Sequence, residues 1–390
     1  MARLTVQERF ALPVIALLAA LAGVANYQTW APVPRFAIAT LALAGLAWVV
    51  SFATEQLGER FGPAITGMLQ STLGNLPELF VVIFALQKGE LVVAQTAIVG
   101  SIFANAMLVL GLVIVVGAQR SPDRVMRFSH RLPRDTATLL LVTVFIIVLL
   151  GLSLASHDPA SHHVDVISAV GAVSLLVVYL AWVVPYLRSD MRPEEQHDGQ
   201  HGSEAQAPVA PSGEGGGAAS TSPPGAQPRA SGAVRNAPRL SLALTLALLL
   251  AAGVASAFVS DWFVNALSPA ILQLKISQAF AGLVIVAIAG NAVENTAGIV
   301  LAWKGRSDLA ISVVKNSVAQ IAAFLFPLLV LISFLLATTL TFALAPVYIG
   351  ALLVMALAMW QVTADGEAAA FEGWALVALY VILATLTLYE

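Results

Sequence analysis

Long apolar stretches alternate with short polar turns along this chain, and most of the stretches run to about 20 residues with few charges. A helix of that length crosses the hydrocarbon layer of a membrane and satisfies its own backbone hydrogen bonds there. The pattern therefore predicts an all-α integral membrane protein with about eleven transmembrane helices. The predicted spans cover residues 10–27, 34–57, 63–87, 90–117, 135–156, 164–187, 239–260, 273–303, 307–336, 343–362 and 369–388.

One long polar segment interrupts this pattern. Residues 191–238 are rich in Gly, Pro, Ser and Ala and cannot bury an apolar face, so we expect a disordered linker there. The linker divides the chain into an N-terminal extra transmembrane helix (1–30) with a first five-helix repeat (31–190), and a second five-helix repeat (239–390).

The two halves share a sequence motif. A shift of 216 residues places Gly74-Asn75-Leu76-Pro77-Glu78 on Gly290-Asn291-Ala292-Val293-Glu294, and the turn Lys88-Gly89 on the turn Lys304-Gly305. Because each repeat holds an odd number of spans, the second copy must enter the membrane in the opposite orientation. Inverted repeats are typical of secondary transporters, which bind their substrates near the midplane between the repeats.

Basic residues gather on one side of the predicted bundle. By the positive-inside rule this side, with the N-terminus and the linker, is cytoplasmic, and the bias suits a bacterial inner membrane. The 3-4-3 spacing from Arg124 to Arg134 further predicts one helix face that contacts anionic lipid. The basic residues of this side are Arg120, Arg124, Arg127, Arg131, Arg134, Lys304 and Arg306.

The residue types disfavour several chemistries. The chain has no cysteine, and its six histidines fall in predicted turns or in the linker, so a thiolate or imidazole metal centre inside the membrane is not expected. No HExxH motif occurs and no aspartate lies deep in a predicted span, which disfavours an intramembrane protease. We expect no enzyme, no cofactor and no nucleic-acid partner.

Two carboxylates lie inside the predicted hydrocarbon layer, at the same place in each repeat. They are Glu78 and Glu294. An ionisable group is expensive in this environment, which makes it a functional candidate, and the repeat symmetry strengthens the case. Asn75 and Asn291 precede the glutamates by three residues and share their helix faces. Pro77 is expected to break its helix and free backbone carbonyls.

The helices that follow add two further polar pairs, Ser101 with Asn105 and Ser317 with Gln320, each on one helix face. Carboxylate, amide and hydroxyl oxygens together form a hard ligand set that suits Ca²⁺ better than softer metals. Burial and mutual repulsion raise the proton affinity of two carboxylates once the cation leaves. A divalent cation and protons would therefore compete for the same oxygens, which is the basis of antiport.

Lys315 lies about two turns inside its predicted helix, just before the second polar pair. Two interpretations are open. The side chain either extends to the membrane surface or serves as an internal counter-cation near the site.

Residues 71–111 and 287–327 resemble the two alpha-repeat motifs of the cation/proton exchanger (CAX) family, within the cation/calcium exchanger superfamily. The resemblance implies a Ca²⁺/H⁺ antiporter that exports Ca²⁺ by alternating access across the lipid bilayer, with Ca²⁺ as transported substrate. It implies that Glu78 and Glu294 bind the metal and protons in turn. Family members commonly carry histidine where this chain has Asn295, so Asn295 is a candidate modulator of the site. Lys315 is a second candidate because of its position beside the polar pair. The amide and hydroxyl residues that complete the site are Asn75, Asn291, Ser101, Asn105, Ser317 and Gln320.

Other functions remain open on the same scaffold. A Na⁺/H⁺ or K⁺/H⁺ antiporter or a Na⁺/Ca²⁺ exchanger could use an oxygen cage as well, although Na⁺/Ca²⁺ exchangers tend to have more acidic residues at the site. A receptor or scaffold without transport would not require duplicated buried carboxylates. Assembly into a homo-oligomer is left open.

Overall fold

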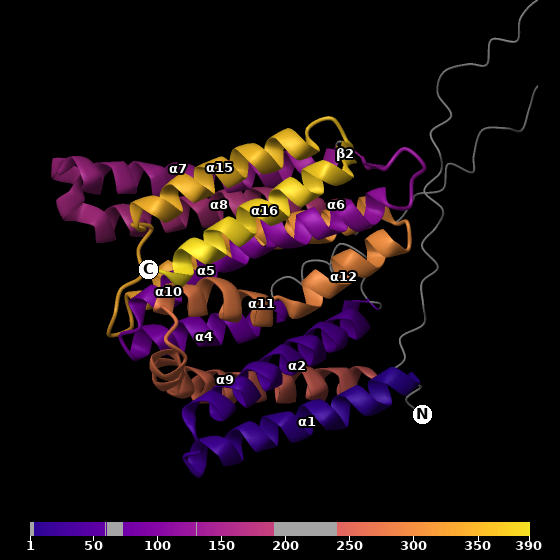
Figure 1. Cartoon of the computed structure of the whole chain (residues 1–390), viewed down its shortest axis with the longest axis vertical. Helices are drawn as coiled ribbons and strands as arrows, with labels where there is room; N and C mark the ends of the chain where they lie inside the picture. Colours follow the sequence, from indigo (N-terminus) through magenta and orange to yellow (C-terminus); the bar gives the residue numbers. More distant parts are fainter. Residues whose placement is uncertain (1–3, 59, 61–72, 130, 191–239) are drawn as a thin grey trace, which may run out of the picture.

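A computed structural model of the chain describes residues 4–58, 60, 73–129, 131–190 and 240–390 (Figure 1). The expected linker at 191–238 lies outside the described residues, as does much of the predicted span 63–87. The described part is almost entirely helical, with one short two-stranded sheet.

The described part of the first half contains four helices of 22 to 27 residues, three shorter α-helices, one π-helix, one 3-10 helix and one strand. They are α1 (Val6–Tyr27), α2 (Pro32–Gly58), α4 (Leu76–Gln87), α5 (Leu91–Phe103), the π-helix η1 (Ala104–Val109), α6 (Leu110–Ala118), β1 (Val125–Arg127), α7 (Arg131–Ser156), the 3-10 helix η2 (Pro159–His163) and α8 (Val164–Asp190).

The second half repeats this plan with more interruptions. Its elements are α9 (Leu242–Leu274), α10 (Gln278–Phe280), the π-helix η3 (Ala281–Val286), α11 (Ala287–Gly290), α12 (Ala292–Trp303), α13 (Ser307–Gln320), the π-helix η4 (Ile321–Leu325), α14 (Phe326–Ser333), α15 (Pro346–Thr363), β2 (Glu367–Ala369) and α16 (Ala370–Leu388).

The lengths and composition of these helices confirm an integral, multi-pass membrane protein. Among the described residues, nine spans are long and apolar enough to cross a membrane. A tenth consists of Gln278–Gly290 and Asn295–Trp303, which meet at a bend of 57°, and α4 is a shorter apolar helix. N- and C-terminal ends lie at opposite ends of the bundle, with the C-terminus at the left in Figure 1.

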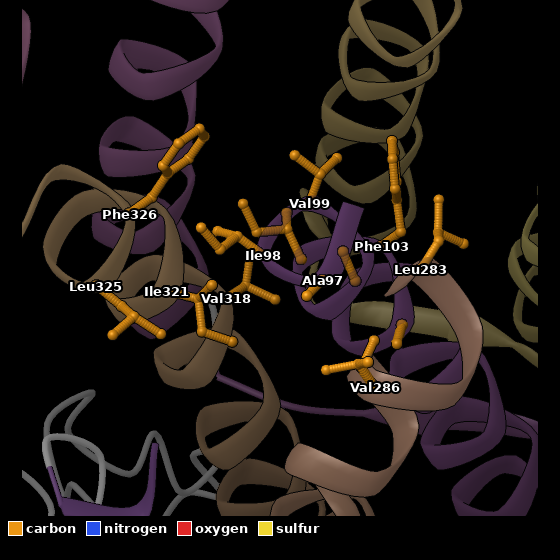
Figure 2. Packing of buried hydrophobic residues seen from close by; sticks show 14 of the residues in the cluster. Ala97, Ile98, Val99, Phe103, Leu283, Val286, Val318, Ile321, Leu325 and Phe326 are labelled. Carbon is orange, nitrogen blue, oxygen red and sulfur yellow. The ribbon is translucent and has the colours of Figure 1, made fainter. Parts of the chain in front are cut away.

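The helices pack in three groups (Figure 1). Helix α2 packs along α9, and α1 packs against α2. Helices α7, α8 and α15 lie at the other side of the bundle, and the helices with the two sequence motifs lie between these groups. Figure 2 shows apolar side chains of α5, η3 and the α13–η4–α14 helix meeting in this middle region. Ile98 of α5 lies near Val318 of α13, and η3 contributes Leu283 and Val286. The motif helices are thus surrounded by tightly packed apolar side chains.

The two repeats make backbone contact where α5 crosses η3. A Cβ atom at Gly100 would lie 2.5 Å from Leu283 Cα, and one at Gly282 would lie 2.0 Å from Thr96 Oγ1. Only glycine, which has no side chain, allows helices to approach this closely.

Helix α9 differs from the prediction. The expected span 239–260 ends at Ser260, but the helix continues for about four more turns to Leu274, through Asp261 and Pro269. Two polar residues of this extension bind the neighbouring repeat, because Lys88 Nζ donates to Asp261 Oδ1 at 2.6 Å and to Asn265 Oδ1 at 2.8 Å.

The predicted arginine stripe is wrong. Arg127 lies in β1, which pairs antiparallel with β2, and α7 begins only at Arg131, so no single helix carries the whole 3-4-3 series. Arg127 instead binds Asp123 Oδ2 at 2.6 Å and Glu367 Oε1 at 3.2 Å. The hydrogen bond from Arg127 holds the pKa of Asp123 below its usual value.

Candidate functional site

Both motif asparagines lie where a helix is interrupted inside the bundle. Asn75 precedes α4 with φ −85° and ψ 8°, and Asn291 separates α11 from α12 with φ −103° and ψ 16°. Pro77 occupies the first turn of α4, where a missing amide hydrogen costs little, so the predicted break lies just before it. The second repeat breaks at the same place without a proline, directly after Gly290.

Glu78 is 1% exposed and lies in the first turn of α4, where the partial positive charge of the helix N-terminus favours a carboxylate. The second motif approaches it closely. A Cβ atom at Gly290 would lie 3.6 Å from Glu78 Cβ. The glutamate of one repeat therefore adjoins the helix break of the other. Glu294 belongs to α12, and its side chain lies outside the described part of the structure.

Three polar side chains from both repeats form a buried network. Asn291 Nδ2 donates to Ser101 Oγ at 2.8 Å and to the Ala287 carbonyl at 2.9 Å. Asn105 Nδ2 donates to Asn291 Oδ1 at 3.3 Å and to the Ser101 carbonyl at 3.0 Å. Ser101, Asn105 and Asn291 are all fully buried. The structure thus brings the first polar pair into contact with the second motif.

The second polar pair lies at the end of α13, which packs against both η1 and α12. Ser317 and Gln320 are 4% and 5% exposed. Among the described residues, four buried side-chain oxygens of this region accept and donate no hydrogen bond, and such atoms are available to a cation. They are Asn105 Oδ1, Asn295 Oδ1, Ser317 Oγ and Gln320 Oε1.

Two π-helical segments lie beside these polar pairs at equivalent positions. η1 covers residues 104–109, and the shift of 216 residues carries residues 105–109 onto η4 at 321–325. π-helical turns are frequent at functional sites. The residue pattern did not predict them.

Lys315 is 1% exposed, so its side chain does not extend to the membrane surface. Its Nζ donates to Thr363 Oγ1 at 2.6 Å, and Thr363 in turn donates to the Met359 carbonyl at 2.7 Å. Ser317 follows Lys315 by two residues, or about 200° of helix rotation, so the two side chains leave α13 on nearly opposite sides. The ammonium group therefore faces α15, behind the side of α13 that carries Ser317.

A polar cluster that sequence analysis missed joins the repeats at the end of the bundle away from the N-terminus. Glu90, at the start of α5, accepts hydrogen bonds from Ser268 of α9 and from Gln278 of α10, the latter at 2.8 Å. Lys88 binds Asp261 nearby. The cluster could not be predicted while α9 was expected to end before Asp261.

The side chains that the structure describes contain no group of three or more His, Cys, Asp and Glu that could hold a metal ion.

Comparison with known proteins places this architecture in a family. A family model described as sodium/calcium exchanger protein matches residues 32–185 and 244–389. The chain is 29% identical over 369 residues to the vacuolar calcium ion transporter of Schizosaccharomyces pombe, which covers 92% of this chain and 80% of that protein. It is 28% identical over 378 residues to the Ca²⁺/H⁺ antiporter of Synechocystis sp., which covers 95% of each protein.

The fold is also that of a solved transporter. The crystal structure of the Ca²⁺/H⁺ antiporter YfkE superposes with a TM-score of 0.74 at 23% identity, covering 98% of this chain and 100% of that one. The resemblance inferred from the two repeat motifs is confirmed, and with it the expectation of a transporter. Because the family model matches most of both halves, the chain belongs to the sodium/calcium exchanger protein family.

Proposed function

We propose that the protein is a secondary antiporter that exports Ca²⁺ in exchange for H⁺ by alternating access. The observation that carries the proposal is the buried Glu78 beside Gly290, because it joins an ionisable side chain of one repeat to the helix break of the other. The names of the relatives from Schizosaccharomyces pombe and Synechocystis sp. support Ca²⁺ as the cation and, for the latter, H⁺ as the counter-ion.

The proposed mechanism rests on competition for oxygen atoms. With Ca²⁺ bound, Glu78 and Glu294 are ionised and the two charges of the cation balance them. When the cation leaves, burial and the mutual repulsion of the carboxylates favour protonation, so the site changes sides in a neutral form. The ionised, empty site would carry uncompensated charge through the membrane and is therefore held back, which couples the two fluxes.

The remaining site residues surround this pair in the proposal. Amide and hydroxyl oxygens come from Asn75, Ser101, Asn105, Ser317 and Gln320. Asn291 contributes an oxygen of its side chain or of its backbone carbonyl. Support comes from the burial of all of them and from the hydrogen bonds that link the two repeats. Asn295 and Lys315 are the proposed modulators of the site.

We further propose that the N-terminus and the segment 191–238 face the cytoplasm of a bacterial inner membrane. The basic side of the bundle supports this orientation, since positive residues are retained inside. The division into an N-terminal helix (1–30) and two five-helix repeats (31–190 and 239–390), with a linker at 191–238, belongs to the same proposal.

The test is Ca²⁺ uptake into everted membrane vesicles under an imposed pH gradient. We expect wild-type uptake to need the gradient, and both Glu78→Gln and Glu294→Gln to abolish it, because each removes a charge that balances the cation. Glu367→Gln is the matched control, since this glutamate lies outside the membrane spans and its carboxylate binds Arg127.

Uptake that persists in both site variants would refute the roles of the two glutamates. Gradient-driven movement of Na⁺ or K⁺ in place of Ca²⁺ would leave the antiporter fold intact and overturn the substrate. A Ca²⁺ flux that requires Na⁺ instead of a pH gradient would identify a Na⁺/Ca²⁺ exchanger.

A further inference from the structure

We propose that Asn291 is a positioning residue, and that the amide oxygen presented to the transported cation is that of Asn105. The inference rests on the proposed function. It refines that function by distinguishing, within one buried network, a residue that only orients its neighbour (a brace) from a residue that binds the cation (a ligand). It reassigns Asn291, whose place in the motif beside Glu294 suggested a direct ligand.

The orientation of both amides follows from backbone carbonyls, which can only accept hydrogen bonds. The side chain of Asn105 lies 3.0 Å from the Ser101 carbonyl, so its NH₂ group must face that atom. The Ala287 carbonyl, 2.9 Å away, fixes the NH₂ group of Asn291 in the same way. The contact of 3.3 Å between the two asparagines then joins the NH₂ group of Asn105 to the oxygen of Asn291.

This arrangement uses both amide hydrogens of Asn291 and one of the two lone pairs of its oxygen. Its NH₂ group donates to the Ala287 carbonyl and to Ser101 Oγ, and its oxygen accepts from Asn105. A cation bound to that oxygen would lie against the NH₂ group of Asn105, whose hydrogens carry positive partial charge. The oxygen of Asn291 is therefore poorly placed for a cation.

Asn105 has the opposite balance. Both of its amide hydrogens are used, and its Oδ1 is fully buried and accepts no hydrogen bond from any residue that the structure describes. A buried oxygen without a partner is costly, and a bound cation removes that cost. Because Asn291 accepts from the NH₂ group, it directs the oxygen of Asn105 away from itself.

The amide of Asn105 has no counterpart at the aligned position of the second repeat. Asn105 is the second residue of η1, and its side chain donates to the Ser101 carbonyl four residues earlier. The equivalent residue of the second repeat is Ile321, which has no amide. The brace and the ligand therefore form a single set that spans the repeat boundary.

A double-mutant cycle in Ca²⁺ uptake by everted vesicles tests the assignment. We expect Asn105→Ala and Asn291→Ala each to raise the Ca²⁺ concentration at half-maximal uptake about tenfold, and the double variant to differ from Asn105→Ala by less than about threefold. The effects do not add, because Asn291 acts through Asn105. The control is Gln95→Ala on the same helix α5, whose amide donates to the Ala343 carbonyl away from this network, and it should match wild type.

Two results would overturn the inference. If the single effects multiply to about a hundredfold in the double variant, Asn291 is an independent ligand. If Asn291→Ala leaves half-maximal uptake unchanged, it positions nothing. If either alanine variant fails to accumulate in the membrane, serine variants replace them, since Asn291→Ser keeps a donor toward Ser101. The ratio of Sr²⁺ to Ca²⁺ uptake must then shift in the same direction in Asn291→Ser as in Asn105→Ser. Shifts in opposite directions overturn the inference.

The outcome is separable from that of the proposed function. Wild-type vesicles that take up no Ca²⁺ refute the proposed substrate before any variant is compared. If they carry Na⁺ or K⁺ instead, the same cycle with that cation as the probe still decides whether Asn291 is a brace or a ligand.

Discussion

The crossing of the two repeats at Gly100 gives a prediction whose size follows from the structure. A Cβ atom at this position would lie 2.5 Å from Leu283 Cα and 2.6 Å from the Leu283 carbonyl oxygen, whereas ordinary contacts of such an atom begin at 3.4 Å. The obstructing atoms belong to the backbone and cannot turn aside as a flexible side chain would. Gly100→Ala must therefore separate α5 from η3 by about 1 Å, a form of overpacking that typically costs ~1–3 kcal/mol.

The same displacement reaches the site, because Ser101 is the next residue. Its hydroxyl accepts from Asn291 at 2.8 Å, and a separation of about 1 Å stretches this bond beyond hydrogen-bonding distance. Loss of one buried hydrogen bond costs about 1 kcal/mol of stability. The larger effect is on transport, since the oxygens of the two repeats no longer meet, and we expect maximal Ca²⁺ uptake to fall at least about tenfold.

Uptake into everted vesicles and the melting temperature of the purified protein measure the two effects together. Gly350→Ala is the matched control, because a Cβ atom at Gly350 in α15 has no neighbour within 4 Å and alanine favours a helix. A Gly100→Ala protein with wild-type uptake and an unchanged melting temperature would show that the helices are not held at this crossing.

Three further predictions concern charges and the linker. Lys315→Ala should strengthen apparent Ca²⁺ affinity, on the order of threefold to tenfold, because it removes a buried positive charge behind the site; uptake curves identical to wild type would exclude that role. Arg127 lowers the pKa of Asp123 below its usual value, so the Asp123–Arg127 ion pair is stabilising above about pH 4. The pair is lost as the pH falls through the lowered pKa. The protection factors of the β1 and β2 amides, which correct for the slower intrinsic exchange at low pH, should therefore fall at about pH 3 relative to pH 5 in wild type and depend less on pH in Asp123→Asn. Deletion of residues 202–232 should leave Ca²⁺ uptake intact if they are only a tether, and loss of uptake by a correctly inserted deletion variant would contradict this.

Sequence reasoning succeeded where one physical cause dominates. The hydrocarbon layer imposes long apolar helices, and Pro77 in the first motif indicated the helix break that precedes α4. It failed where tertiary contacts decide. The predicted span ended at residue 260, yet α9 continues through Asp261, which binds Lys88 of the other repeat.

The arginine series failed for a related reason. Its spacing fitted a helix, but β2, more than two hundred residues away in sequence, pairs with residues 125–127 and holds them in a strand. The π-helical turns could not be predicted either, since they depend on how η1 and η4 pack in the bundle. The contacts around Asn291 likewise follow from which helix the inverted second repeat brings beside Ser101.

The repeats agree in backbone and differ in side chains, and the proposed exchange explains both facts. Their helix breaks, at Asn75 and Asn291, and their π-helical turns occur at equivalent positions. Alternating access makes the two halves exchange roles as the site opens to one side and then the other, so both need the same places at which a helix can yield. The cation, however, occupies one cage shared by both halves. The two halves need only supply a complete set of ligands together. Asn105 can therefore align with the apolar Ile321 of the second repeat without loss of function.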